Sequence, residues 1–160
     1  SFNLELFKVY KKYQWIFDWL ISHNKFYHNI TLANDVCNSI RCKNTVKYNI
    51  TKNTIEFTHR DTYDFAEEQD IYWGSYIILK NVEHENRYSL KLYFNLEQCD
   101  ENKKEEIKEK IYEYREKTIG STAKRVLVLE YEDVSKRSLA DRFDELFSIL
   151  KKLQKVYVIK

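Results

Sequence analysis

The chain contains very few of the two residues that proteins use most often in tight loops. Its 160 residues include two glycines, Gly74 and Gly120, and no proline, where average usage predicts about 11 and 8. Loops that cradle phosphate need several glycines, because side chains keep the backbone N–H groups away from the anion. The sequence therefore excludes a P-loop and a dinucleotide-binding fingerprint, and its turns have to be built from Asn, Asp, Ser and Lys.

Length and apolar content predict one folded domain over residues 1–160. Hydrophobic residues make up 43% of the chain, and its net charge is +2. A disordered protein has a low hydrophobic content and a large net charge, so disorder is not expected. No apolar run approaches the ~18 residues of a membrane span, and no signal-peptide pattern is recognisable. We therefore expect a cytoplasmic protein with no membrane partner. The abundance of Lys, Asn, Ile and Tyr suggests a bacterial or phage genome rich in A and T.

The cysteines and histidines do not predict a metal site. Three cysteines form no disulfide framework, so reduced thiols are expected. His23, His28, Cys37 and Cys42 offer zinc-ligand types, but their spacing does not suit a zinc knuckle, whose paired ligands stand two to four residues apart. No metal and no other cofactor is expected.

Apolar residues that recur every three or four positions predict four helices. These are residues 4–22, 32–40, 101–118 and 138–155. In the first helix Trp15 and Trp19 widen the apolar stripe, which predicts more than one packed face. Thr31 and Ser138 are expected as N-caps, the second in a capping box, and Gly120 as a left-handed C-cap.

Alternating patterns predict two hairpins and two later strands. The hairpins join residues 46–50 to 55–57 through 51–54, and 71–79 to 87–94 through 83–86. The run 126–129 is apolar throughout, which favours a central strand, and 156–159 is expected as a last strand. The order is two N-terminal helices, two hairpins, then α-β-α-β. The predicted class is α+β, a single mixed, mainly antiparallel sheet with helices packed on it.

An acidic stretch is the first candidate binding surface. Residues 1–60 hold 9 basic and 4 acidic side chains, whereas residues 61–100 hold 3 and 9. Carboxylates grouped so closely repel one another, so a basic protein partner would relieve the repulsion; a solvated loop or short helix is the alternative. Neighbouring aromatic residues are typical of binding hot spots. The candidate residues are Asp61, Asp64, Glu67, Glu68, Asp70, Tyr72 and Trp73.

A basic cluster near the N-terminus is the second candidate surface. Lysines that contact phosphate beside aromatics that stack on bases are the ingredients of single-strand binding. The same tyrosines also fit the buried stripe of the predicted helix, so both interpretations stay open. The candidate nucleic-acid-binding residues are Lys8, Lys11, Lys12, Tyr10 and Tyr13.

Each catalytic motif that the sequence suggests lacks a residue that the chemistry requires. A restriction-type nuclease needs an Asp and a Glu-x-Lys on neighbouring strands to hold a metal, and no predicted strand carries that pair. Glu130 and Glu132 form a strand-end acid pair without the lysine. His59-Arg60-Asp61 follows a strand and could support general base chemistry, but no nucleophile accompanies it. No catalytic residue is assigned.

Small size, many aromatic residues and the lack of a catalytic motif favour a non-catalytic protein-binding module. The expected kind is an immunity protein, antitoxin or inhibitor of a bacterial or phage conflict system, because Tyr and Trp give large, rigid contact areas. The alternative is a nucleic-acid-binding domain or a degenerate restriction-type nuclease.

Overall fold

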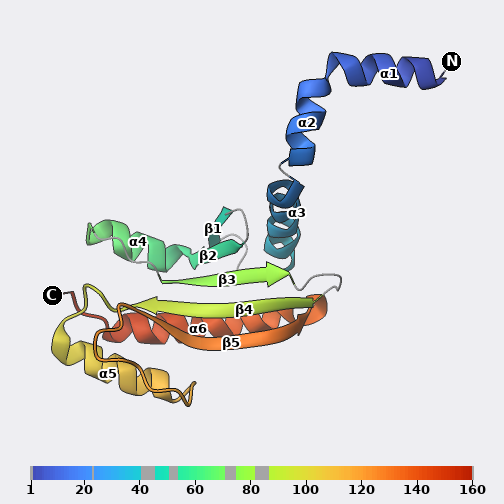
Figure 1. Cartoon of the computed structure of the whole chain (residues 1–160). Coiled ribbons are helices and arrows are strands. Elements are labelled where there is room, and N and C mark those ends of the chain that lie inside the picture. Colours follow the sequence, from blue (N-terminus) through green and yellow to red (C-terminus); the bar gives the residue numbers. More distant parts are fainter. Residues whose placement is uncertain are drawn as a thin grey trace.

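The computed structural model describes residues 2–22, 24–40, 46–50, 54–70, 75–81 and 87–159. Figure 1 shows the helices and strands of this described chain. The helices are α1 (Phe2–Lys12), α2 (Gln14–Ser22), α3 (Asn24–Ser39), α4 (Arg60–Glu68), α5 (Glu101–Tyr112) and α6 (Leu139–Val156), with a 3₁₀ turn η2 (Lys136–Ser138). The strands are β1 (Val46–Ile50), β2 (Ile55–His59), β3 (Tyr76–Asn81), β4 (Arg87–Asn95) and β5 (Arg125–Ser135).

Each strand of the described sheet pairs with the next one along the chain, in the order β1-β2-β3-β4-β5, and each pair is antiparallel. Ile50 pairs with Ile55 in the first hairpin, and Tyr76 pairs with Tyr93 in the second. Buried and half-buried residues alternate along β2 and β4, as expected for strands with one face on a core. The predicted α+β class, with a mainly antiparallel sheet and helices packed on it, is confirmed.

β5 lies at the edge of the sheet, so the prediction of a central strand is wrong. Leu92 pairs with Leu129 and Tyr93 with Leu127, which leaves Val128 as an extra residue on β5. A bulge of this kind interrupts the alternation of sides along a strand, and Val128 and Leu129 both contact the core. The unbroken apolar run therefore reflects a bulge, and not a strand covered on both faces.

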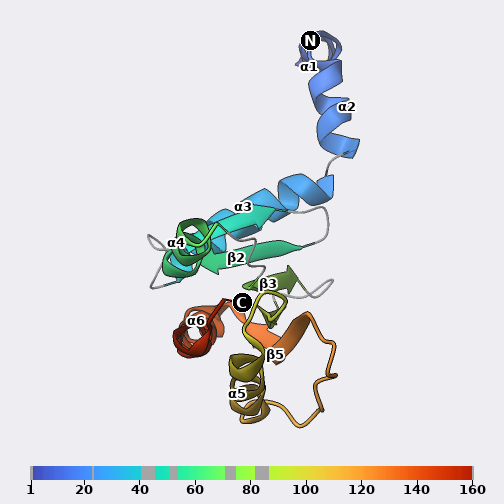
Figure 2. The same ribbon diagram turned by 90° about the vertical axis from the view of Figure 1, so that its left-hand side faces the viewer.

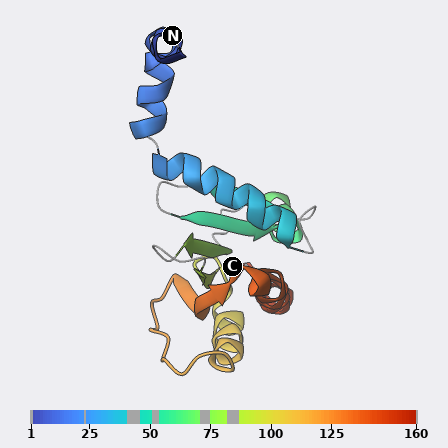
Figure 3. The ribbon, with the colours of Figure 1, turned by 90° about the vertical axis from the view of Figure 1, so that its right-hand side faces the viewer.

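The core lies between the sheet and helices from both ends of the chain. Phe143 of α6 meets Phe57 of β2 edge to face, with ring centroids 5.0 Å apart, and both side chains are fully buried. Figure 2 shows α4 and α6 on the same side of the strands, and Figure 3 shows α3 running along the first hairpin. Leu32 and Val36 of α3 complete this core.

Three predicted helix caps are wrong. α3 begins at Asn24, so Thr31 lies inside it. α5 ends at Tyr112, and Gly120 does not have the positive φ of a left-handed cap. Ser138 makes no side-chain cap bond to α6, because it follows a 3₁₀ turn and its Oγ accepts a hydrogen bond from the Oγ of Ser135. Hydrophobic periodicity shows where a helix is, but not which polar group ends it.

The predicted last strand is also wrong for most of its length. Val156 is the final residue of α6. Ile159 pairs with Cys99 in an isolated bridge, and the N–H of Asp100 donates to the carbonyl of Val158 at 2.7 Å. Val158 and Ile159 therefore lie beside the start of α5 instead of adding a strand to the sheet.

The predicted first helix is two helices that stand away from the sheet. α1 and α2 meet at Tyr13, whose carbonyl accepts hydrogen bonds from the N–H groups of Ile16 and Phe17. Figure 1 shows α1 and α2 projecting beyond the end of the sheet and meeting at a sharp bend. We call residues 2–22 the arm.

Candidate protein-binding surfaces

The arm exposes large apolar side chains along its whole length. Trp15 is 72% exposed and Leu6 56% exposed. The exposed members of this set are Leu4, Leu6, Phe7, Val9, Tyr10, Tyr13, Trp15, Phe17 and Trp19. The prediction that this segment packs on more than one face is therefore wrong within the described chain, because the arm extends past the elements that would cover it. Large apolar patches of this kind mark interaction sites.

Three lysines on α1 form what we call the lysine row: Lys8, Lys11 and Lys12. Lys8 is 3.3 Å from Glu5, Lys11 lies over the ring of Phe7, and Lys12 lies over the ring of Tyr13. Tyr10 and Tyr13 are 37% and 41% exposed. The tyrosines are thus not in a buried stripe, and their rings are accessible beside the lysines.

The acidic stretch forms the helix α4, and its first carboxylate, that of Asp61, forms an ion pair with α6. Asp61 Oδ2 is 3.4 Å from the Nζ of Lys151 and 3.6 Å from the Nδ1 of His59. Thr62, the next residue, is buried, and its hydroxyl donates to the Oε1 of Gln154. Asp61 and Thr62 therefore both connect α4 to α6, Asp61 through an exposed ion pair and Thr62 through a hydrogen bond.

The outer side of α4 carries what we call the acidic row: Asp64, Glu67 and Glu68. Among the described residues, these three carboxylates form no ion pair, and Glu67 and Glu68 are exposed. Asp70 follows the helix with a φ of 51°, in the left-handed region. Tyr72 and Trp73, the aromatic members of the predicted site, lie outside the described residues.

His59 caps α4, which explains the His-Arg-Asp triple in structural terms. Its Nδ1 accepts a hydrogen bond from the backbone N–H of Asp61 at 3.2 Å, as an N-cap side chain does. Its ring lies edge-on against Phe147, with centroids 5.4 Å apart. Burial, then the nearby charge of Lys151, lowers the pKa of His59 below its usual 6.5, while Asp61 opposes the shift. The imidazole is therefore neutral at pH 7, with its proton on Nε2.

A hollow of about 380 Å³ opens beside His59. Its lining includes three lysines and comes largely from α6: His59, Asp144, Phe147, Ser148, Lys151, Lys152 and Lys155. Lysines at the C-terminal end of a helix also stabilise its dipole. This location accounts for the charges of the hollow without a ligand.

Glu130 and Glu132 lie inside β5, which continues to Ser135, so the prediction that they stand at a strand end is wrong. Both line an open depression of about 460 Å³. Glu130 is 3.4 Å from the Nζ of Lys91, so its charge is partly neutralised. Burial, followed by a hydrogen bond to Glu145, raises the pKa of Tyr131 to about 12. The phenol of Tyr131 therefore stays protonated at neutral pH and is poorly suited to act as a base.

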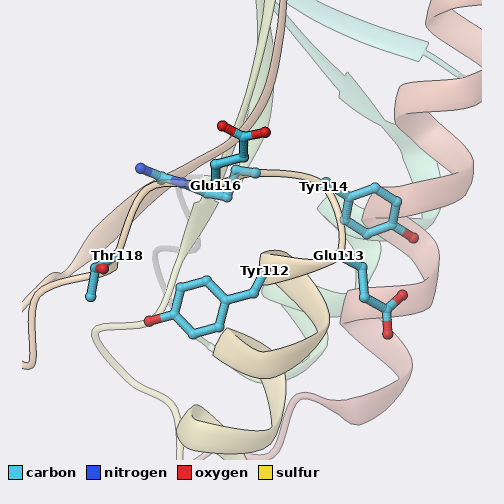
Figure 4. A pocket seen from close by; sticks show the side chains of 6 residues that line it. Tyr112, Glu113, Tyr114, Glu116 and Thr118 are labelled. Carbon is cyan, nitrogen blue, oxygen red and sulfur yellow. The ribbon is translucent and has the colours of Figure 1, made fainter.

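A third hollow, of about 760 Å³, lies at the C-terminal end of α5. Figure 4 shows Tyr112 and Thr118 on one side of it and Glu113 and Tyr114 on the other. The hydroxyl of Tyr112 accepts from the N–H of Ile119 at 3.2 Å, and Arg115 donates to the carbonyl of Leu127. These bonds hold the segment that connects α5 to β5, so the polar groups have a structural use.

Metal-ligand side chains do not converge in the described part of the chain. No group of three or more His, Cys, Asp or Glu residues there is arranged to hold a metal ion. Cys37 and Cys99 are not joined in a disulfide, and burial raises the pKa of Cys99. His23 and Cys42, two members of the zinc alternative, lie outside the described residues.

Comparison with protein-family models, with curated proteins and with solved structures finds no match for this chain. None of the described helices combines the length and apolar character needed to cross a bilayer. Sequence reasoning recognised the lysines and tyrosines of α1 as a candidate surface, but it missed the exposure of the large apolar side chains of the arm. A signal was present, because the apolar residues of α2 cover more of its circumference than one neighbouring element can bury.

Proposed function

We propose that this protein is a non-catalytic protein-binding module whose arm is the main contact surface. It would belong to the kind of module that includes immunity proteins, antitoxins and inhibitors of bacterial or phage conflict systems. One observation carries the proposal: the arm holds a continuous set of exposed Trp, Tyr, Phe and Leu side chains. Monomeric soluble proteins rarely expose so much contiguous apolar surface.

The composition of the arm supports a protein partner. Trp and Tyr dominate binding hot spots because they bury a large area and lose little conformational entropy. In α2 the apolar residues Trp15, Ile16, Phe17, Trp19 and Leu20 follow one another around the helix. Only the side that carries Asp18 is polar, and so wide an apolar surface is stable when most of the helix is covered. A protein groove, or several helices, provides such surroundings.

The first test removes the two tryptophans of the arm. We expect Trp15→Ser with Trp19→Ser to abolish capture of the partner from an extract of the native host. Loss of one hot-spot residue costs about 2 kcal/mol or more, which is about a thirtyfold loss of affinity. Quantitative capture with immobilised full-length chain measures the effect.

Val158→Ser serves as the matched control, because Val158 is 48% exposed but lies at the other end of the chain. The control should capture the partner as the unaltered protein does. Equal capture by the tryptophan variant, with unchanged circular dichroism, would contradict the proposal.

A second candidate function is single-stranded nucleic-acid binding, which the exposed rings of Tyr10 and Tyr13 beside the lysine row favour. Three phosphate contacts predict that affinity falls about twentyfold between 50 and 200 mM salt. Fluorescence anisotropy with a labelled oligonucleotide tests this function, with Lys8→Ala, Lys11→Ala and Lys12→Ala as the variant. Affinity that does not change with salt, or no binding, removes this candidate.

A further inference from the structure

We propose that the arm docks on a second copy of this chain, with the lysine row of each copy facing the acidic row of the other. The inference rests on the proposed function, in that the arm binds protein, and it names the partner. It also joins two charged clusters, the lysine row of α1 and the acidic row of α4, in one contact.

The two rows match in charge and in spacing. Lys8, Lys11 and Lys12 occupy positions i, i+3 and i+4 of α1, and Asp64, Glu67 and Glu68 occupy the same positions of α4. Each set therefore lies on one side of its helix and extends over about 6 Å of the axis. Two helices packed side by side can bring three lysines against three carboxylates without distortion of either helix.

A second copy is needed because the two rows are far apart within one molecule. Figure 1 shows α1 at the free end of the arm and α4 beside the opposite end of the sheet, and Figure 2 shows the same separation from another side. The arm leads away from its own α4. The carboxylates of the acidic row form no ion pair among the described residues, so they are available to another chain.

The apolar side chains of the arm also suit a symmetric pair. When two arms cross at a two-fold axis, the apolar side chains of each α2 pack against the other arm and against the body of the partner. A standard interface uses about 20–30 residues on each side; residues 2–22 together with the outer side of α4 provide a surface of that size. Because the contact is reciprocal, it closes as a dimer and does not continue into a filament.

The experiment exchanges the charges of the two rows. The first variant carries Lys8→Glu, Lys11→Glu and Lys12→Glu; the second carries Asp64→Lys, Glu67→Lys and Glu68→Lys. Sedimentation velocity from about 1 to 100 µM measures the monomer–dimer equilibrium. We expect the unaltered chain to dimerise and each variant alone to have a dissociation constant at least about tenfold higher. An equimolar mixture of the two variants should restore the dimer, because both reciprocal contacts then join opposite charges.

The control variant, with Lys117→Glu, Lys136→Glu and Arg137→Glu, makes the same charge change on exposed residues outside the arm. It should dimerise like the unaltered chain. A monomeric unaltered chain, or a mixture of folded variants that stays monomeric, overturns the inference. If host-protein capture still depends on Trp15 and Trp19 in that case, the arm binds a different protein, and the proposed function stands. Binding of the unaltered monomer to an oligonucleotide or to anionic vesicles overturns the inference in favour of those partners.

Discussion

At the scale of single residues, His59 combines three constraints in one side chain. It ends β2, it caps α4 through its Nδ1, and it is almost fully buried against Phe147. The neutral imidazole satisfies all three. A proton on Nδ1 would remove the acceptor of the cap and place a charge beside Lys151 in a buried position. Burial and Lys151 lower the pKa of His59 for the same reasons.

This pKa shift predicts how stability depends on pH. Because the folded-state pKa lies below 6.5, the unfolded chain binds more protons at His59 when the pH falls through that value. The stabilising contribution is therefore fully present above pH 6.5 and is lost as the pH falls below it. We expect the melting temperature to fall between pH 7.5 and 5.5, and His59→Asn, which keeps a cap acceptor, to show a smaller fall. His28→Asn, at an exposed histidine, should behave like the unaltered chain; a slope identical in all three proteins would contradict the assignment.

At the scale of elements, the N-terminal ends of α5 and α6 show when a polar residue acts as a helix cap. Asp100 begins α5, and its side chain accepts hydrogen bonds from the N–H groups of Asn102 and Lys103. Ser138 has the residue type of a cap but makes no such bond. The difference lies in the backbone, because Asp100 is extended with a ψ of 135° whereas Ser138 is already helical with a ψ of −7°. A cap residue needs a non-helical backbone to reach the free N–H groups.

The cap at Asp100 predicts a specific pair of stability changes. Asp100→Ala should reduce the free energy of unfolding by about 1 kcal/mol, because two N–H groups of α5 lose their acceptor. Asp100→Asn retains an oxygen acceptor and should cost less than half as much. Urea unfolding followed by circular dichroism measures both. Equal losses in the two variants would assign the effect to the charge of Asp100 and not to the cap.

At the scale of the whole molecule, the core joins segments that are distant in sequence. Phe57 comes from the first hairpin and Phe143 from the last helix. Phe147 extends the same aromatic cluster, with its ring centroid 5.8 Å from that of Phe143. The arm has no comparable connection to this core, since its large side chains are mostly exposed. The described chain therefore has a packed body and a projecting arm.

The position of Phe143 in the core predicts a large loss of stability on truncation. Phe143→Ala should lower the free energy of unfolding by about 3–5 kcal/mol, because it leaves a cavity between α6 and β2. Phe143→Leu fills most of the space and should cost clearly less. Thermal unfolding of the two variants under the same conditions gives the comparison. A loss below about 1 kcal/mol for Phe143→Ala would mean that this cluster is not the centre of the core.

Local patterns in the sequence were sufficient to predict the α+β class, the first hairpin and the two C-terminal helices. Side-chain periodicity reports which residues face a core, and the hairpin and α6 both have one strongly apolar side. The acidic stretch was also recognised as a charged surface, and its helical form gives the carboxylates of the acidic row a common side.

Only the tertiary structure decided what lies beside each element. Periodicity does not distinguish a central strand from a bulged edge strand, so the position of β5 depends on its pairing with β4. It also does not distinguish an apolar helix that is buried in its own domain from one that is exposed. The arm belongs to the second kind because the rest of the described chain packs elsewhere, and this arrangement, which arises from long-range contacts, is what makes residues 2–22 a candidate binding surface.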